Sequence, residues 1–103
     1  MTRADLPPGD QAVQAAHAAL DFAAAEPVIF RRWQQSSNTL ALLAAPDELE
    51  LCWLLERARR ARVTAVPFRE PDLGGELTAV ALEPGGRALC RTYPLALAGG
   101  DVS

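Results

Sequence analysis

The stretch TLALLAAPDELELCWLLERARRARVTAV, residues 39–66, decides which fold class we expect. Residues 39–45 form a continuous apolar run of strand length, which is typical of a strand buried on both faces of a sheet. Residues 47–61 have the pattern of an amphipathic helix, and residues 63–66 form a second strand segment that reaches Phe68. This succession of strand, helix and strand predicts an α/β domain.

The predicted helix over residues 47–61 has a start signal and an end signal. Asp47 followed by Glu50 resembles a capping box, in which an acidic side chain accepts hydrogen bonds from the first free amide groups. Four arginines lie in or just after the last turns, where positive charge is favourable beside the helix dipole. The inward residues are predicted to be Leu51, Leu54, Leu55 and Ala58, and the arginines are Arg57, Arg59, Arg60 and Arg62.

An earlier helix is predicted over residues 11–25. Asp10 is a favourable N-cap residue, and Pro27 stops the helix. Apolar residues recur here with the period of an α-helix, so we expect them to face the sheet. That face consists of Val13, Ala16, His17, Leu20 and Ala24.

The remaining segments complete one expected domain over residues 1–97. Residues 26–38 are predicted to be a connector that includes a short helical turn. Residues 77–82 are predicted to be a third strand, and residues 98–103 a flexible tail.

Composition and charge exclude several classes of protein. Half of the 103 residues are hydrophobic and 22% are charged, which excludes a disordered chain. The formal net charge of −3 excludes non-specific nucleic-acid binding over the whole surface. All ten cations are arginine, so no lysine is present for a Schiff base or a general base. No run is long enough to span a bilayer and no signal peptide opens the sequence, which predicts a cytoplasmic protein without membrane contact.

The sequence predicts no metal and no cofactor. His17, Cys52 and Cys90 do not have the spacing of metal ligands. The glycine pairs at residues 74–75 and 85–86 lack the lysine and the spacing of a phosphate-binding loop, so a nucleotide hydrolase is also excluded.

Two blocks of sequence together resemble a known family. The first is DLPPG at residues 5–9, which leads to QAAHAA at residues 14–19. The second is FREPDL at residues 68–73, followed by ELTAVAL at residues 76–82. At this spacing they resemble the archaeal/eukaryotic-type peptidyl-tRNA hydrolases, in particular a bacterial and phage-like branch, over roughly residues 3–97.

The resemblance implies both a fold and a reaction. The fold is a small three-layer α/β/α domain with a mixed sheet of three to four strands. The reaction is hydrolysis of the ester between a stalled peptide and the 3′ end of its tRNA, which releases the peptide and recycles the tRNA. It needs a water directed at the ester carbonyl, a group that orients or deprotonates this water, and donors for the developing oxyanion.

The family's catalytic positions transfer to this sequence as follows. A threonine at the start of the last strand falls on Thr78. The acidic residue falls on Glu70 by strand register or on Asp72 by residue type, and both alternatives stay open. His17 is a further candidate for the site, and the competing interpretation is a structural histidine on the buried helix face.

The lysine that family members have at the start of the first helix has no counterpart, and Asp10 or Gln11 stands near its place. The implied partner is the tRNA acceptor end with its attached peptide, bound partly through arginine contacts to phosphates. The residues assigned to substrate binding are Arg31, Arg32, Arg57, Arg60, Asp10 and Gln14. A solvated surface is the competing interpretation of the arginines.

Family members begin with a full apolar strand, whereas only Met1, Thr2 and Arg3 precede Ala4 here. We therefore expect an unfilled position in the sheet. Either another chain fills it, as in a hypothetical homodimer, or the start of the sequence is truncated. Three functions follow, ranked in this order: a peptidyl-tRNA hydrolase, a catalytically silent protein that binds tRNA or a protein, and an accessory domain whose open sheet edge recruits another strand.

Overall fold

Four strands form one mixed sheet in the order β2-β1-β4-β3. They are β1 (Thr2–Arg3), β2 (Ala44–Ala45), β3 (Ala65–Glu70) and β4 (Glu76–Leu82). β1 runs parallel to β2 and antiparallel to β4, and β3 and β4 form an antiparallel hairpin. The structure, a computed structural model, describes residues 1–98, so the tail expected over residues 98–103 lies outside the described residues from residue 99 onward.

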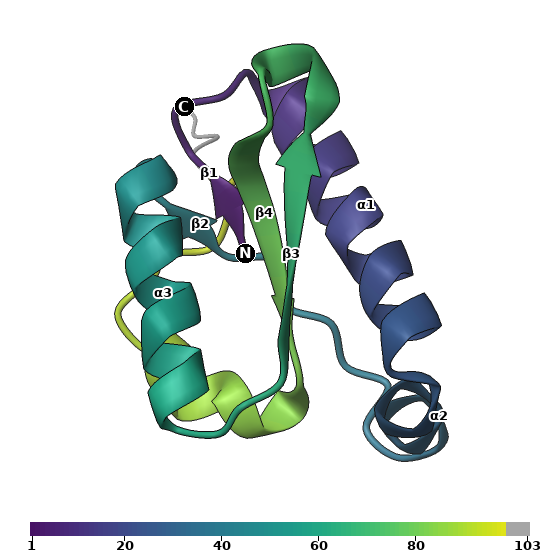
Figure 1. Ribbon diagram of the computed structural model, residues 1–103. Coiled ribbons are helices and arrows are strands. Elements are labelled where there is room, and N and C mark those ends of the chain that lie inside the picture. The colour runs from purple at the N-terminus through teal and green to yellow at the C-terminus, as the bar shows by residue number, and fades with distance from the viewer. Residues whose placement is uncertain (99–103) are drawn as a thin grey trace.

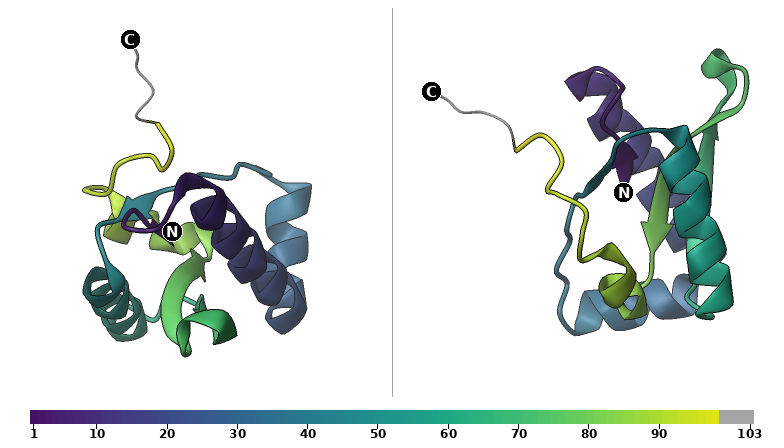
Figure 2. Two further views of the ribbon diagram at one scale, coloured as in Figure 1. Left: turned by 90° about the horizontal axis from the view of Figure 1, so that it is seen from above. Right: turned by 90° about the vertical axis from the view of Figure 1, so that its left-hand side faces the viewer.

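Helices cover both faces of this sheet (Figure 1). The elements are α1 (Pro8–Ala25), α2 (Pro27–Gln35), α3 (Glu48–Arg60) and two short 3₁₀ helices, η1 (Pro71–Leu73) and η2 (Pro84–Cys90). α1, with α2 at its C-terminal end, covers one face, and α3 covers the other; Figure 2 shows the same layers from above. This arrangement confirms the predicted α/β/α fold class. Within residues 1–98, no helix combines the length and the apolar character that a bilayer span requires.

α1 begins earlier than predicted. Pro8 is its first residue and Pro7 its N-cap, so the prediction of Asp10 as the N-cap is wrong. The fixed φ of proline suits the first helical position, where a missing N–H costs nothing. The end is as expected, because the helix stops at Ala25 and Pro27 opens α2.

The predicted buried face of α1 is also wrong. Val13 is 52% exposed and Leu20 is 69% exposed, and His17, Ala16 and Ala24 are exposed as well. The buried residues are instead Gln11, Gln14, Ala18 and Phe22. The periodicity of apolar residues indicated the wrong face because two of the residues that are actually buried are glutamines. Their side-chain amide groups are hydrogen-bonded within the fold.

The strand predicted over residues 39–45 is almost absent. Only Ala44 and Ala45 are paired as a strand, Leu43 forms an isolated bridge with Leu95, and Leu40 is 77% exposed. The physical reason is the shortness of its partner, because β1 extends only from Thr2 to Arg3. Residues 39–42 therefore have no strand beside them on that side.

β1 occupies a central position of the sheet, so the expectation of an unfilled position is wrong over Thr2–Arg3. Thr2 lies opposite Ala44 on one side and Ala79 on the other. The Met1 amino group continues the pairing by donating a hydrogen bond to the Val80 carbonyl at 2.9 Å.

α3 and the hairpin agree closely with the sequence. Asp47 is the N-cap of α3, and its side chain accepts a hydrogen bond from the Glu50 amide at 3.0 Å. The predicted inward residues of α3 pack as expected, and the core lies between this helix and the sheet. The core cluster consists of Met1, Ala45, Leu51, Leu54, Leu77 and Val80. The predicted connector over residues 26–38 contains more regular structure than expected, since α2 spans nine residues of it.

Candidate active site

A β-bulge in the hairpin positions Thr78. Phe68 pairs with Ala79 and Arg69 pairs with Leu77, which leaves Thr78 as the extra residue of β4. A bulge changes the direction in which a strand's side chains point, and bulges are frequent beside active sites. Here the bulge turns Thr78 toward α1, where its side chain is fully buried.

Thr78, Gln14 and Glu70 form a continuous hydrogen-bond chain, which we call the site network. The Thr78 hydroxyl donates to Gln14 Oε1 at 2.7 Å, and Gln14 Nε2 donates to Glu70 Oε1 at 2.9 Å. The orientation of the amide is fixed by chemistry, because a carboxylate can only accept and the amide NH₂ can only donate. The front of α1 and the hairpin therefore meet at one end of the sheet.

The two acidic candidates differ in their surroundings. Glu70 lies in the site network, and its second oxygen accepts a hydrogen bond from the Asp72 amide at 3.2 Å. The hydrogen bond from Gln14, followed by that from the Asp72 amide and the charge of His17, lowers the pKa of the Glu70 carboxyl. The Asp72 side chain is exposed on η1, and only its backbone N–H contacts the site network.

Two glycines close the loop that holds Glu70. Gly74 and Gly75 have φ values of +68° and +84°, in the left-handed region that L side chains rarely adopt. The Gly75 amide donates to the Glu70 carbonyl at 2.9 Å, so the turn folds back on the residue that carries the carboxylate.

His17 lies one turn beyond Gln14 on α1 and is exposed, so the interpretation as a buried structural histidine is wrong. Its ring stacks on Phe68 with centroids 4.6 Å apart and planes 6° apart. Phe68 is two residues before Glu70 on β3. The imidazole is therefore an exposed group at the border of the site network.

Asp10 and Gln11, near the place of the family lysine, have different positions. Asp10 is exposed in the first turn of α1. Gln11 is buried, and its amide donates to the Leu6 carbonyl at 2.7 Å, while its own carbonyl accepts from the Thr2 hydroxyl. Gln11 thus fixes the turn before α1. No side chain caps the start of this helix, whose first N–H groups carry partial positive charge.

Arg3 is a buried residue of this region that the sequence interpretation did not single out. Its guanidinium donates to both oxygens of Asp5 at 2.9 Å, to Glu76 at 2.7 Å and to the Leu77 carbonyl at 3.2 Å. The Asp5 hydrogen bonds raise the pKa of Arg3 and lower the pKa of Asp5. The cluster ties β1 to the start of β4. The Arg-x-Asp spacing was visible in the sequence, but the distant partner Glu76 was not.

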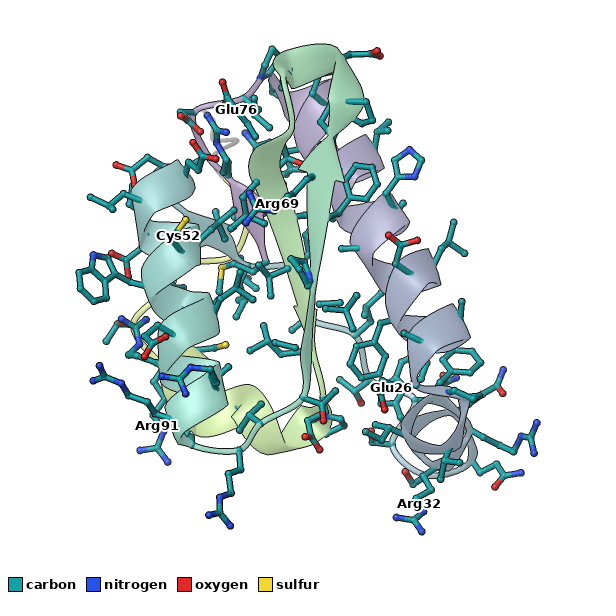
Figure 3. All side chains as sticks on the ribbon, viewed as in Figure 1. Glu26, Arg32, Cys52, Arg69, Glu76 and Arg91 are labelled. Atoms are coloured by element: carbon teal, nitrogen blue, oxygen red, sulfur yellow. The ribbon has the colours of Figure 1, made fainter. Side chains whose placement is uncertain are left out.

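The arginines predicted to bind substrate do not join the site network. Arg31 and Arg32 lie on α2 and Arg57 and Arg60 on the last turns of α3, at the end of the molecule opposite the β3–β4 loop. Figure 3 shows Arg32 at that far end and Glu76 near the site end. Arg60 pairs with Glu56 at 2.9 Å and Arg57 lies 3.5 Å from Glu50, whereas Arg31 and Arg32 are exposed. The sequence prediction grouped residues that the fold separates.

Within residues 1–98, no group of three or more His, Cys, Asp or Glu side chains is arranged to hold a metal ion. Every buried side-chain nitrogen and oxygen of this part of the chain has a hydrogen-bond partner. The site network is therefore a fully satisfied polar group with one carboxylate that reaches the surface.

Comparison with known proteins identifies the family of this chain. The family described as Peptidyl-tRNA hydrolase PTH2 matches residues 2–96. A search of curated proteins finds no match. Because the family match spans nearly the whole chain, including α1 and both hairpin strands, the chain belongs to the peptidyl-tRNA hydrolase PTH2 family, and its reaction is the hydrolysis of peptidyl-tRNA.

Proposed function

We propose that Glu70 is the catalytic group of this hydrolase and that Gln14 and Thr78 position it. The observation that carries the proposal is the site network, in which the Glu70 carboxylate is half-exposed while Thr78 is fully buried. A buried hydroxyl whose proton is donated to Gln14 does not reach the substrate. Thr78 therefore acts through Gln14, and Glu70 contacts the attacking water.

Glu70 orients water as a carboxylate. Its lowered pKa keeps it ionised at neutral pH, where it accepts a hydrogen bond from a water that faces the ester carbonyl. A lowered pKa also makes the group a weaker base, so orientation contributes more than early proton removal. Asp72, the alternative acid, supplies its backbone N–H to Glu70 in this proposal.

The missing lysine leaves the developing negative charge without a nearby ammonium. Arg3, the buried arginine of this end, is held by Asp5 and Glu76. The start of α1 has no side-chain cap, and because Pro7 and Pro8 lack N–H groups, its partial positive charge comes from the N–H groups of Gly9 and Asp10. We propose that these N–H groups take the oxyanion or the terminal phosphate of the tRNA, and that the chain is active without the lysine.

The finer sequence predictions stay proposals. Assignment to the bacterial and phage-like branch rests on the resemblance, and a cytoplasmic location rests on the sequence patterns described above. Arg31 and Arg32 are exposed and suited to phosphate contacts, so tRNA binding through them predicts an affinity that falls as salt rises. The homodimer also stays a hypothesis, although β1 occupies the sheet position at Thr2–Arg3 through which pairing was expected.

A catalytically silent tRNA-binding protein is the second candidate. The observation that favours it is the absence, within residues 1–98, of an ion pair or hydrogen bond between any arginine and the site network. It predicts salt-sensitive tRNA binding with no ester hydrolysis above background.

The decisive experiment compares Glu70→Gln with Asp72→Asn. Both changes replace a carboxylate by an amide of the same size, and the two residues lie two positions apart. We expect release of N-acyl amino acid from acylated tRNA to fall at least about tenfold in Glu70→Gln and to stay within about twofold in Asp72→Asn. The opposite pattern would assign the role to Asp72, and no hydrolysis by the unaltered chain would favour the silent protein.

A further inference from the structure

An aromatic pair lies on the border of the site network, and we call it the stacked pair. The His17 imidazole of α1 lies against the Phe68 ring of β3, with centroids 4.6 Å apart and planes 6° apart. His17 is exposed and Phe68 is half-buried, so Phe68 covers one face of the imidazole and the rest of the side chain is open to solvent. The stacked pair therefore presents a flat aromatic surface whose orientation is fixed from below.

The stacked pair is close to the carboxylate of the site network. Phe68 and Glu70 are two positions apart on β3, and both contact α1, Phe68 through His17 and Glu70 through Gln14. Two residues along a strand span roughly 6–7 Å. Residues three positions apart on a helix, such as Gln14 and His17, have Cβ atoms roughly 5–6 Å apart. One nucleotide is long enough to contact both the imidazole and the carboxylate.

The other aromatic side chains of residues 1–98 lie away from the site network. Phe22 is buried. Phe30 and Trp33 pack against each other on α2, at the far end of α1. Trp53 is exposed on α3, which covers the opposite face of the sheet, and Tyr93 packs against the core on that same side. Among the described residues, the stacked pair is thus the aromatic surface that a group bound at Glu70 can reach.

The charges around the stacked pair favour an uncharged ligand over a phosphate. Glu70 carries a negative charge, Asp72 is exposed just after β3, and Asp21 is exposed one helical turn after His17. Arg69 lies between the two site residues of β3, but alternation along a strand directs it to the other face of the sheet. Carboxylates repel a phosphate placed here, whereas a nucleobase stacks through its uncharged face.

We propose that the stacked pair binds the unpaired 3′-terminal base of tRNA, which stacks on the outer face of the His17 imidazole. The inference rests on the proposed function, in which the ester lies beside Glu70. The terminal base and the ester are attached to the same ribose, so a base held on His17 brings the ester carbonyl to the water at Glu70. Single-stranded RNA ends are recognised by stacking on aromatic side chains, including histidine. His17 is then a substrate-binding residue and neither an acid nor a base.

The invariant part of the substrate is the part that suits such a surface. Every peptidyl-tRNA has the same terminal nucleoside on one side of its ester, whereas the peptide on the other side differs from substrate to substrate. A flat surface at a fixed distance from the carboxylate can position the constant group, and positioning of the reacting bond is a large part of catalysis.

The test measures the binding of deacylated RNA, so it does not depend on hydrolysis. The probes are two labelled RNA hairpins that copy a tRNA acceptor stem with its single-stranded 3′ end, one intact and one lacking only the terminal base. We expect fluorescence anisotropy to show that the intact hairpin binds at least about fivefold more tightly, the low end of what one stacked base contributes. Equal affinity of the unaltered protein for the two hairpins would overturn the proposal.

Substitutions at His17 show whether the preference for the terminal base comes from the imidazole ring. His17→Ala and His17→Gln remove the ring and are expected to bind both hairpins with the affinity of the abasic one. His17→Phe keeps an aromatic face without an ionisable nitrogen and is expected to retain the preference. Leu20→Ala is the matched control on the same helix, where Leu20 is 69% exposed, and it should also retain the preference. A preference that persists in His17→Ala, or is lost in His17→Phe or Leu20→Ala, would overturn the proposal.

Kinetics separate this proposal from the one on Glu70. With acylated tRNA, His17→Ala is expected to raise KM at least about fivefold with a smaller change in kcat, and His17→Phe to restore the KM of the unaltered chain. A loss of kcat at unchanged KM in both variants would make His17 an acid or a base and overturn the proposal. If Glu70→Gln stays active while the hairpin preference depends on His17, the assignment of Glu70 is wrong and the stacking proposal holds.

Discussion

The two ends of β4 differ in how completely their polar groups are satisfied. At the start, the Leu77 amide donates to Glu48 at 2.8 Å, its carbonyl accepts from Arg3, and the Thr78 hydroxyl is held by Gln14. At the other end, the strand borders an apolar cavity, and its neighbour β1 has stopped at Met1. β4 therefore extends from a region of hydrogen-bonded polar groups to a region that borders an apolar cavity.

This difference separates two kinds of function. A side chain that is held by several hydrogen bonds adopts a single conformation. Such preorganised groups are suited to catalysis. An apolar lining is suited to contacts with apolar groups. The comparison therefore predicts that substitutions at the start of β4 reduce hydrolysis more than substitutions beside the cavity.

The largest expected effect is that of Thr78→Val. Valine keeps the shape of threonine but removes the hydroxyl, which leaves Gln14 Oε1 buried without its donor. An unsatisfied buried polar group costs roughly 1–3 kcal/mol, so Gln14 is expected to turn away from Glu70 and hydrolysis to fall about tenfold or more. Single-turnover release of N-acyl amino acid from acylated tRNA measures this loss.

Thr78→Ser is the matched control, because serine restores the hydroxyl at the same position. We expect it to recover most of the activity, while a purely structural role for the threonine methyl would leave both variants equally impaired.

The sequence predicted the elements better than their faces. α3 agreed because each of its inward positions is apolar and its cap, Asp47, is a local signal. α1 disagreed because Gln11 and Gln14 are buried through partners on β1 and β3, and long-range hydrogen bonds leave no periodic pattern in a sequence. The apolar run at residues 39–45 had strand composition but lacked a neighbouring strand to pair with.

The candidate site was predictable in part for the same reason. Thr78 and Glu70 are eight positions apart in one hairpin, so the resemblance placed them near each other through local sequence. The bulge that turns Thr78 toward α1 depends on hairpin register, which no single-residue signal reveals. Arg57 and Arg60 were assigned to the site because of their charge. The charge of a residue does not predict which end of a helix lies beside the site.

A smaller effect is expected from Gln14→Leu on the pH dependence of hydrolysis. The Gln14 hydrogen bond favours the ionised form of Glu70 and is the largest cause of its lowered pKa. The activity of the unaltered chain should therefore persist down to pH values below the usual carboxyl range of about 4.3, and be lost as pH falls through the pKa of Glu70. In Gln14→Leu this pKa rises, so the acid limb moves to higher pH. Gln34→Leu, the same change on the exposed surface of α2, should not move it.

The smallest effect is expected from Asp10→Lys. This variant tests whether a positive charge near the start of α1 increases the rate of hydrolysis. The change replaces an acid in the first turn of α1 by an ammonium near the place of the family lysine. An ammonium attracts a phosphate or oxyanion about 4 Å away by roughly 1 kcal/mol in water, so kcat/KM is expected to rise by up to about fivefold at low salt. Asp21→Lys makes the same charge change at the far end of α1. An equal gain in both variants would show a general attraction for tRNA, whereas a gain confined to Asp10→Lys would place the unmet charge at the site network.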